Sequence, residues 1–321
     1  TLTTSSAASD VYKRQTFDTT GIREDLTDVI YNISPEDTPI LSAIPRTAAK
    51  GTKHEWQLDA LAAPAANSVI EGDDATIDAM VATTRAFNFT QIQDKVIALS
   101  GTQSSVDAAG RADEMAYQIA KKSKELKKDM EFALIKGTVQ EAGDATDARD
   151  LGSLPTWIKT NGDAGTSGSL STGSGTDLPN SGTDRDLTET ILKTVIQEVY
   201  TSGGDLDLLV VPPSVKQVIS GFNANTTRFG PADKRVEYAA IDVYSSDFGD
   251  IQVVPNRVMA TTDEKLCFLL QSDMAAAAYL RDFQIGDLAK TGDSEKKQLL
   301  VEWTLEVRNE AAHGIILDIN Q

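Results

Sequence analysis

Two alternating segments joined by a long stretch with little apolar bulk constrain the fold of this chain most. Residues 52–60 alternate in polarity like a half-buried strand, and residues 82–99 return as a second strand rich in aromatic and branched side chains. One face of the first strand carries the larger side chains His54, Trp56 and Leu58. The connection over residues 61–81 is too long for an ordinary loop inside a compact domain, and such loops are usually functional or mobile. We therefore expect a long hairpin with a projecting loop.

Composition narrows the class of protein. The 321 residues carry 30 Lys and Arg against 48 Asp and Glu, a formal net charge of −18, which disfavours a dedicated nucleic-acid reader. No run approaches the roughly 18 apolar residues that a membrane helix needs, so we expect no membrane partner. The single Cys267 excludes an intrachain disulfide and fits synthesis in a reducing cytosol. His54 and His313 lack the neighbouring ligands of a zinc site.

One long amphipathic helix is expected over residues 110–137, with a glycine at its end. Its apolar stripe is made by Met115, Ile119, Leu126, Met130 and Ala133. The opposite face carries Lys121, Lys124 and Lys128, and residues 111–136 hold seven basic and five acidic side chains, +2 against −20 for the remainder. These lysines form either an ordinary solvated helix face, which we prefer, or a basic rib that faces a polyanion.

The two ends of the chain differ in composition and in polarity pattern. Residues 1–15 are mostly Ser, Thr and Ala without a secretory signal, and we expect them to be non-native or disordered. Pro35 and Pro39 forbid a long helix between residues 16 and 46, which predicts an extended arm with one short helical turn opened by Ser34. Near the C-terminus, residues 299–307 alternate as a strand, and residues 315–319 are expected to return as its partner.

The second half begins with a low-complexity segment over residues 161–185, which holds six Gly, five Ser and four Thr. This composition predicts a flexible linker or exposed insertion. An α/β unit follows it, with a helix that begins at Asp186 and ends at Gly203-Gly204. Its other predicted elements are a helix over residues 214–222 and strands over residues 206–211, 236–244, 251–254 and 266–270.

Catalytic motifs are missing from the sequence. It contains no phosphate-binding or dinucleotide-binding glycine loop, no HExxH and no GxSxG. KTG at residues 290–292 and SxxK at residues 294–297 match the motifs of penicillin-recognising enzymes, but in reversed order and one residue apart. Acidic pairs such as Asp205 with Asp207 lack EF-hand spacing, so we prefer solvated turns to Ca²⁺ or Mg²⁺ sites. We expect no enzyme, with no catalytic, cofactor-binding or metal-binding residues.

The order of arm, long hairpin, long helix, α/β unit and terminal strands resembles the major capsid protein of tailed bacteriophages. The most specific pieces are GIREDL (21–26), SPEDTP (34–39), VVPNR (253–257), LAKTGDS (288–294) and EWTLEVRNE (302–310). The resemblance covers residues 16–321. It implies the α+β capsid fold that tailed phages share with encapsulin shells and the herpesvirus capsid floor.

The resemblance also implies a division of the chain. Residues 16–50 would form the N-terminal arm and residues 51–100 the extended β-hairpin loop. Residues 101–150 and 275–321 would form a peripheral domain whose spine helix is 110–137, and residues 151–274 an axial domain with an insertion at 161–185. Implied inter-subunit contacts are Arg23, Glu24, Trp56, Glu71, Asp73, Lys290 and Asp293. The implied genome-facing residues are Lys121, Lys124 and Lys128.

By the same resemblance, the chain would assemble with itself into pentamers and hexamers of an icosahedral shell around double-stranded DNA. Further implied partners are portal and scaffolding proteins and a decoration protein, with the genome enclosed without sequence-specific binding. The protein would be made in the host bacterial cytoplasm and end in the virion. Two alternatives remain at this point, an encapsulin-type compartment and, from a different class, a soluble α/β enzyme; an extracellular adhesin is disfavoured because no secretion signal is visible.

Overall fold

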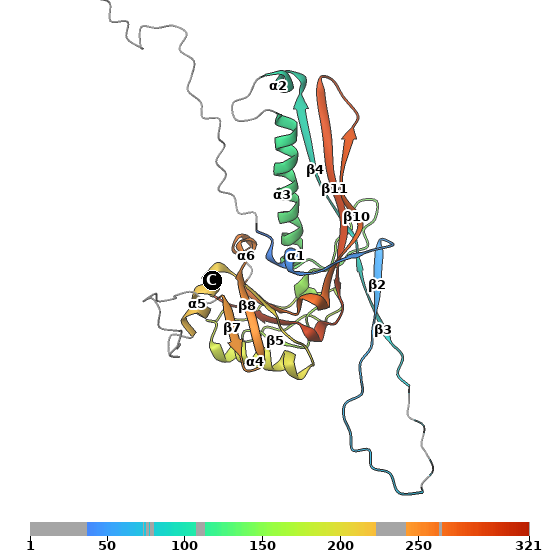
Figure 1. Cartoon of the computed structure of the whole chain (residues 1–321), viewed down its shortest axis with the longest axis vertical. Helices are drawn as coiled ribbons and strands as arrows, with labels where there is room; N and C mark the ends of the chain where they lie inside the picture. The colour runs from blue at the N-terminus through green and yellow to red at the C-terminus, as the bar shows by residue number, and fades with distance from the viewer. Residues whose placement is uncertain are drawn as a thin grey trace, which may run out of the picture.

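The computed structural model describes residues 37–72, 74, 77, 80–106, 113–222, 242–262 and 265–320. In this part of the chain, one elongated sheet with a long helix lies beside a broader α/β region, and a thin hairpin projects away from both (Figure 1). The elements before the α/β region are α1 (Pro39–Ala43), β1 (Arg46–Ala48), β2 (Lys53–Leu58), β3 (Thr84–Phe89), β4 (Gln91–Ser100), α2 (Gly101–Ser105) and α3 (Glu114–Ile135).

The remaining elements alternate between helices and strands. They are η2 (Leu154–Thr156), β5 (Gly162–Asp163), α4 (Glu189–Thr201), β6 (Leu208–Val211), α5 (Pro213–Phe222), β7 (Val243–Ser246), β8 (Gly249–Pro255), α6 (Arg257–Thr262), β9 (Leu266–Leu270), η4 (Ser272–Met274), β10 (Ala275–Leu288), β11 (Ser294–Val307), η5 (Glu310–Ala312) and β12 (Gly314–Leu317). The strands form a four-stranded sheet in the order β1-β10-β11-β4, a six-stranded sheet in the order β5-β12-β9-β6-β8-β7, and the pair β2-β3.

The long helix predicted from its apolar stripe is present as α3. Asp113 accepts a hydrogen bond from the Ala116 amide and caps the first turn, and the helix ends at Ile135, before the glycine. Four of the five predicted stripe residues are buried, while Ile119 is partly buried against the same core. The stripe therefore packs as amphipathic periodicity requires.

The six-stranded sheet has two buried faces, which explains why its inner strands read as continuous apolar runs. On one face, Leu209, Cys267 and Ile316 pack with α4 and α5. On the other face, Val210 and Phe268 join the core of α3 and the four-stranded sheet. Two hydrophobic cores thus share one sheet, which connects the α/β region to the elongated region.

The predicted return strand over residues 82–99 is two strands in different sheets. β3 pairs antiparallel with β2, whereas β4 pairs antiparallel with β11. The break falls at Thr90, whose amide donates to the Thr52 carbonyl and whose side chain is buried against β11. The apolar alternation also shifts by one residue here, from Phe87 and Phe89 at odd positions to Ile92 and Val96 at even positions. The pattern does not say which sheet each strand joins, and contacts with β11 decide that.

The predicted pairing of the terminal strands is wrong. β11 is flanked by β10 and β4, and β12 instead pairs with β9 and β5. Every residue of β12 is buried, and a strand buried on both faces belongs inside a covered sheet. The C-terminal segment therefore supplies a strand to the sheet of the α/β region as well as to the elongated sheet.

The Gly- and Ser-rich segment over residues 161–185 is not a free linker. Its strand β5 pairs with β12, and Ser169 and Asn180 exchange both backbone hydrogen bonds, at 3.1 and 2.9 Å. Asp318 reinforces it by accepting a hydrogen bond from the Gly165 amide at 2.9 Å. Backbone hydrogen bonds to the sheet replace the apolar burial that this composition cannot supply.

One predicted boundary changes, and two predictions lie partly or wholly outside the described residues. The turn predicted to open at Ser34 lies outside them, and the short helix α1 begins at Pro39, the second of the two prolines. Thr188 rather than Asp186 caps α4, accepting a hydrogen bond from the Ile191 amide. Part of the strand predicted over residues 236–244 lies outside the described residues, which show β7 from Val243.

Candidate functional site

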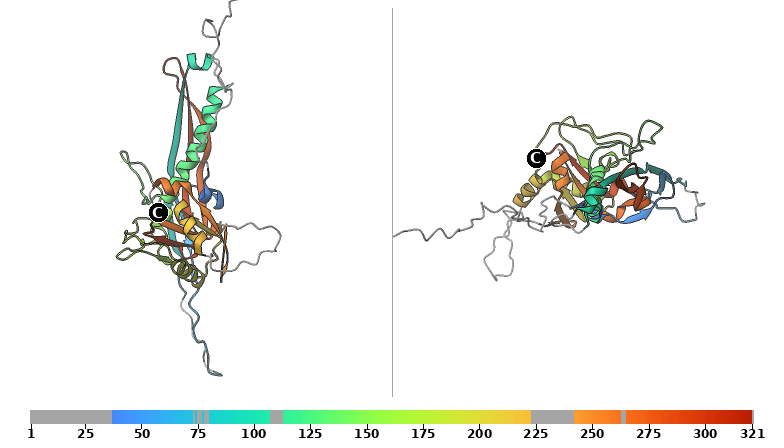
Figure 2. Two further views of the ribbon diagram at one scale, coloured as in Figure 1. Left: turned by 90° about the vertical axis from the view of Figure 1, so that its left-hand side faces the viewer. Right: turned by 90° about the horizontal axis from the view of Figure 1, so that it is seen from above.

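The projecting hairpin exposes an apolar surface that the rest of the described chain does not cover. Between β2 and β3 the loop leaves the body of the molecule, and a second direction of view shows the same projection (Figure 2). Its large apolar side chains are almost fully exposed: Leu61, Val69, Ile70, Ile77, Met80 and Val81. Residues 59–83 also hold five carboxylates and no Lys, Arg or His. Exposed apolar surface of this extent marks a protein-contact site.

The β3 side of the hairpin base is fixed by the side chain of Asn88, which is fully buried. Its amide nitrogen donates to the carbonyls of Leu305 at 2.8 Å and Gly152 at 3.2 Å. Its amide oxygen accepts from the Gly152 amide at 2.8 Å. One side chain thus joins β3 to β11 and to the loop before η2, and substitution would leave buried backbone groups unpaired.

A buried carboxylate, Glu302 on β11, lies just beyond Asn88. It accepts hydrogen bonds from Arg149 at 2.6 Å, Arg281 at 2.6 Å and the Thr90 hydroxyl at 3.0 Å. Burial raises the pKa of Glu302, but the bonds from Arg281 and Thr90 outweigh burial and hold that pKa below its ordinary value. The carboxylate is therefore ionised and joins four separate segments of the chain.

The β2 side of the base has two attachments. His54 Nε2 lies 2.9 Å from Glu306 Oε2 on β11, and both side chains are largely buried. Trp56 packs on Trp157, with ring centroids 5.4 Å apart. On the same face of β11, the Thr304 hydroxyl donates to the Phe89 carbonyl at 2.8 Å. The hairpin is thus held by alternate residues of a single strand, Glu302, Thr304 and Glu306.

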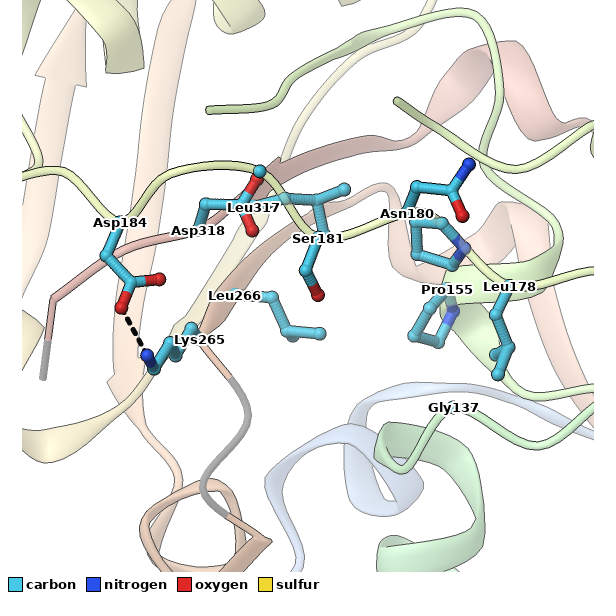
Figure 3. A pocket seen from close by; sticks show the side chains of 12 residues that line it. Gly137, Pro155, Leu178, Asn180, Ser181, Asp184, Lys265, Leu266, Leu317 and Asp318 are labelled. Atoms are coloured by element: carbon cyan, nitrogen blue, oxygen red, sulfur yellow. Dashed lines mark hydrogen bonds and ion pairs between the residues drawn. The ribbon is translucent and has the colours of Figure 1, made fainter. Parts of the chain in front are cut away.

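A cavity in the described part of the chain lies away from this base. It has a volume of about 620 Å³ and lies between the ordered 178–184 segment and the sheet (Figure 3). Figure 3 shows that two of its charged side chains, Lys265 and Asp184, pair with each other. The third, Asp318, accepts a hydrogen bond from the Gly165 amide. Pro155, Leu178, Leu266 and Leu317 line much of the rest. Such a lining offers no nucleophile with an adjacent base.

The buried imidazole of His313 and the buried thiol of Cys267 are also not placed as catalytic groups. Burial lowers the pKa of His313 to about 4, and its ring contacts the Gln271 amide and the Met274 carbonyl. Burial raises the pKa of the Cys267 thiol, which is fully enclosed. Within the described residues, no three His, Cys, Asp or Glu side chains group together as metal ligands do. No helix in those residues has the length and apolar character to span a bilayer.

Comparison of the sequence with known proteins identifies the family of this chain. Residues 12–320 match the family model for the SU10 major capsid protein. The chain belongs to the SU10 major capsid protein family. It is also similar to the major capsid protein of Escherichia phage Phieco32, with 26% identity over 337 residues, 94% of this chain and 95% of that protein. The chain is a phage major capsid protein, and the match supports this interpretation over the encapsulin and soluble-enzyme alternatives.

Solved capsids share the fold at low sequence identity. The cyanophage A-1(L) capsid matches 96% of this chain and 99% of its own, with a TM-score of 0.67 and 16% identity. The capsid of a native GTA particle matches 100% of both chains with a TM-score of 0.61 and 13% identity. A structure from Mycobacterium phage Adephagia matches 94% of this chain and 95% of its own, with a TM-score of 0.61 and 12% identity. The tailed-phage capsid fold predicted for this SU10 family member is confirmed.

The residues predicted from the resemblance as inter-subunit contacts fall at separate places in the capsid protein. Trp56 lies half-buried at the hairpin base, and Glu71 is exposed in the projecting loop. Lys290 and Asp293 are exposed in the β10–β11 turn, at the opposite end of the molecule in Figure 1, where the Gly101 amide donates to the Asp293 carbonyl. The other three, Arg23, Glu24 and Asp73, lie outside the described residues.

The predicted basic face of α3 has the expected exposure. Lys121 and Lys124 are exposed, and Lys128 is half-buried. These three side chains lie on the side of α3 away from Leu126 and Met130, which are fully buried. Their partner, whether solvent or a polyanion, stays a prediction.

Sequence reasoning named His54 and Trp56 but missed the role of the other side chains that hold the hairpin. Glu302 and Glu306 were named only as members of a polar strand face and of a family motif, and Asn88 and Arg149 were not singled out. One available signal was the polar face of the 299–307 strand, where Glu302, Thr304 and Glu306 alternate. Three polar residues on one strand face predict contact with solvent unless another segment covers them, and here the hairpin does.

Proposed function

We propose that this capsid protein builds its shell by laying the projecting loop of each subunit over a neighbouring copy, within pentamers and hexamers. The observation that supports this proposal most strongly is the exposure of the loop. Leu61, Ile77 and Met80 are fully exposed, while the base of the hairpin is attached to the body of the molecule. Burial of such side chains against a partner stabilises association by about 1.5–3 kcal/mol each. A loop without a core gains its order from that contact, which makes assembly cooperative.

The individual contacts form part of the same proposal. The exposed Glu71, Lys290 and Asp293 would meet neighbouring subunits directly. Trp56 would act through the hairpin, because its ring packs on Trp157 of its own chain. The remaining proposed contacts are Arg23, Glu24 and Asp73. The arm (16–50), extended loop (51–100), peripheral domain (101–150 and 275–321) and axial domain (151–274) would take the roles that the resemblance implies.

Electron microscopy of the purified chain with light scattering tests the proposal. We expect closed polyhedral shells or five- and sixfold rings, because the exposed loop should drive self-association. If the chain stays a small oligomer, a scaffolding protein is added, since a missing scaffold has the same effect. A small oligomer that persists with scaffold present would contradict self-assembly through these surfaces.

We further propose that Lys121, Lys124 and Lys128 face the packaged double-stranded DNA. The rest of the chain is strongly acidic, so it would repel the genome and keep it mobile, while this helix face would attract phosphates without reading sequence. Portal, scaffolding and decoration proteins complete the proposed partners. The role is structural and needs no catalysis, with synthesis in the host bacterial cytoplasm before incorporation into the virion.

Charge reversal of Lys121, Lys124 and Lys128 to Glu should shorten the packaged genome while shells still form, because repulsion raises the cost of confining DNA. Genome length in purified particles, measured by pulsed-field electrophoresis, gives the result. The control reverses Lys50 and Lys159, which are exposed away from α3. Full-length genomes in the α3 variant would show that this face is merely solvated.

A further inference from the structure

His54 occupies a distinctive place in the hairpin, because it joins a strand of the projecting element to the sheet of the body. Its Nε2 lies 2.9 Å from Glu306 Oε2, and the two side chains are only 15% and 12% exposed. The other polar attachments of the base are Asn88 to backbone, Thr304 to the Phe89 carbonyl and Thr90 to Glu302. All three fasten β3 or the residue after it, whereas His54 fastens β2.

We propose that His54 and Glu306 form a proton-dependent latch that holds the loop-bearing hairpin against the four-stranded sheet. An imidazole changes its charge between about pH 5 and pH 8. When protonated, His54 forms a hydrogen-bonded ion pair with the Glu306 carboxylate, whereas the uncharged ring can donate a hydrogen bond to it but adds no attraction between opposite charges. The hairpin is therefore held most firmly in mild acid and loosens as the pH rises.

The charged groups around His54 favour this behaviour. Glu306 is the carboxylate that faces the ring, and Arg308 lies beyond it, with its Nε 3.1 Å from the other Glu306 oxygen. Lys53 and Glu55 lie on the opposite face of β2, where they pair with each other at 2.6 Å. On β3, the residue opposite His54 is Asn88, which does not titrate.

The acceptor, Glu306, has a pKa held below its ordinary value, so it keeps its negative charge in mild acid as well as at higher pH. The hydrogen bond from His54 lowers the pKa of Glu306, burial opposes this, and the bond from Arg308 adds to the lowering. Further along β11, Glu302 is held ionised by Arg281, Thr90 and Arg149. Loss of the latch with rising pH thus follows from His54 alone, and it does not depend on what the loop contacts in an assembled shell.

Hydrogen–deuterium exchange of the full-length chain tests the latch. After correction for intrinsic rates, amides of β2 and β3 should exchange about fivefold faster at about pH 8 than at about pH 5.5, because the uncharged ring no longer forms an ion pair with Glu306. His54→Gln keeps a donor without a titratable charge, and it should abolish this difference. Glu306→Gln, which removes the charge from the acceptor, should reduce it strongly and serves if the first variant fails to fold.

Thr304→Val is the matched control, because it removes a neighbouring attachment that carries no charge. It should raise exchange equally at both pH values and leave the ratio unchanged. A wild-type hairpin whose corrected exchange is the same at both pH values overturns the proposal. So does a His54→Gln hairpin that keeps the wild-type ratio.

Discussion

Shell assembly should be lost when Leu61, Ile70 and Met80 are replaced together by Ser, while the folded subunit keeps its stability. These side chains are exposed and make no core contact in the isolated chain, so folding does not depend on them. Each contributes about 1.5–3 kcal/mol when it is buried against a partner, and together they should weaken each contact by more than a hundredfold. Light scattering gives the assembled fraction, and thermal unfolding gives the stability.

A control substitution at another exposed apolar residue separates the loop from general surface hydrophobicity. Val218 on α5 is 43% exposed, and Val218→Ser should leave assembly intact. Shells formed at the wild-type concentration by the triple-loop variant would show that the loop does not make the decisive contact. The same variant, if it stays unassembled as expected, provides a background in which the stability of the single subunit can be measured.

Replacing Glu131 by Ala should lower the free energy of unfolding by about 4 kcal/mol, a large part of the stability of a typical domain. Glu131 is fully buried on α3 and accepts hydrogen bonds from the Ile40 amide at 3.0 Å, the Leu41 amide at 2.8 Å and Asn256 Nδ2 at 2.6 Å. Alanine would leave these three donors, two buried and one partly buried, without their acceptor. Urea unfolding followed by tryptophan fluorescence measures the change.

Two substitutions test whether this loss comes from the buried acceptor. Glu131→Gln keeps one acceptor oxygen and should cost about half as much. Glu125→Ala removes a partly exposed carboxylate of the same helix, paired with Lys122 at 2.6 Å, and should cost less than about 1 kcal/mol. Equal losses for the Ala variants at positions 125 and 131 would mean that the effect is one of helix propensity.

Glu131 also shows what the tertiary structure contributes to the architecture. It joins α3 to α1 and, through Asn256, to the loop before α6, where Asn256 accepts from the Val258 amide. Desolvation raises the pKa of Glu131, opposed by the bonds from Leu41, Ile40 and Asn256. Nothing in the sequence around Glu131 distinguishes it from the exposed acids of the helix, because its partners are far along the chain.

Local periodicity in the sequence was sufficient to predict α3, the alternation of β2 and the inner strands of the α/β region. These features depend on side chains three, four or two residues apart, and their physical cause is local. The absence of a catalytic motif and the family motifs likewise pointed to a capsid protein. The matched family model then established the family.

Only the tertiary structure decided which segments meet. The chain passes from one sheet to another at Thr90, and β12 pairs with β9 rather than with β11 as predicted. The Gly- and Ser-rich segment is ordered by hydrogen bonds to a distant strand. The hairpin base, with Glu302, Glu306 and Asn88, likewise depends on contacts between segments that are far apart in the sequence. A strand pattern states which face is buried but not which partner buries it, because backbone hydrogen bonds are alike along every strand.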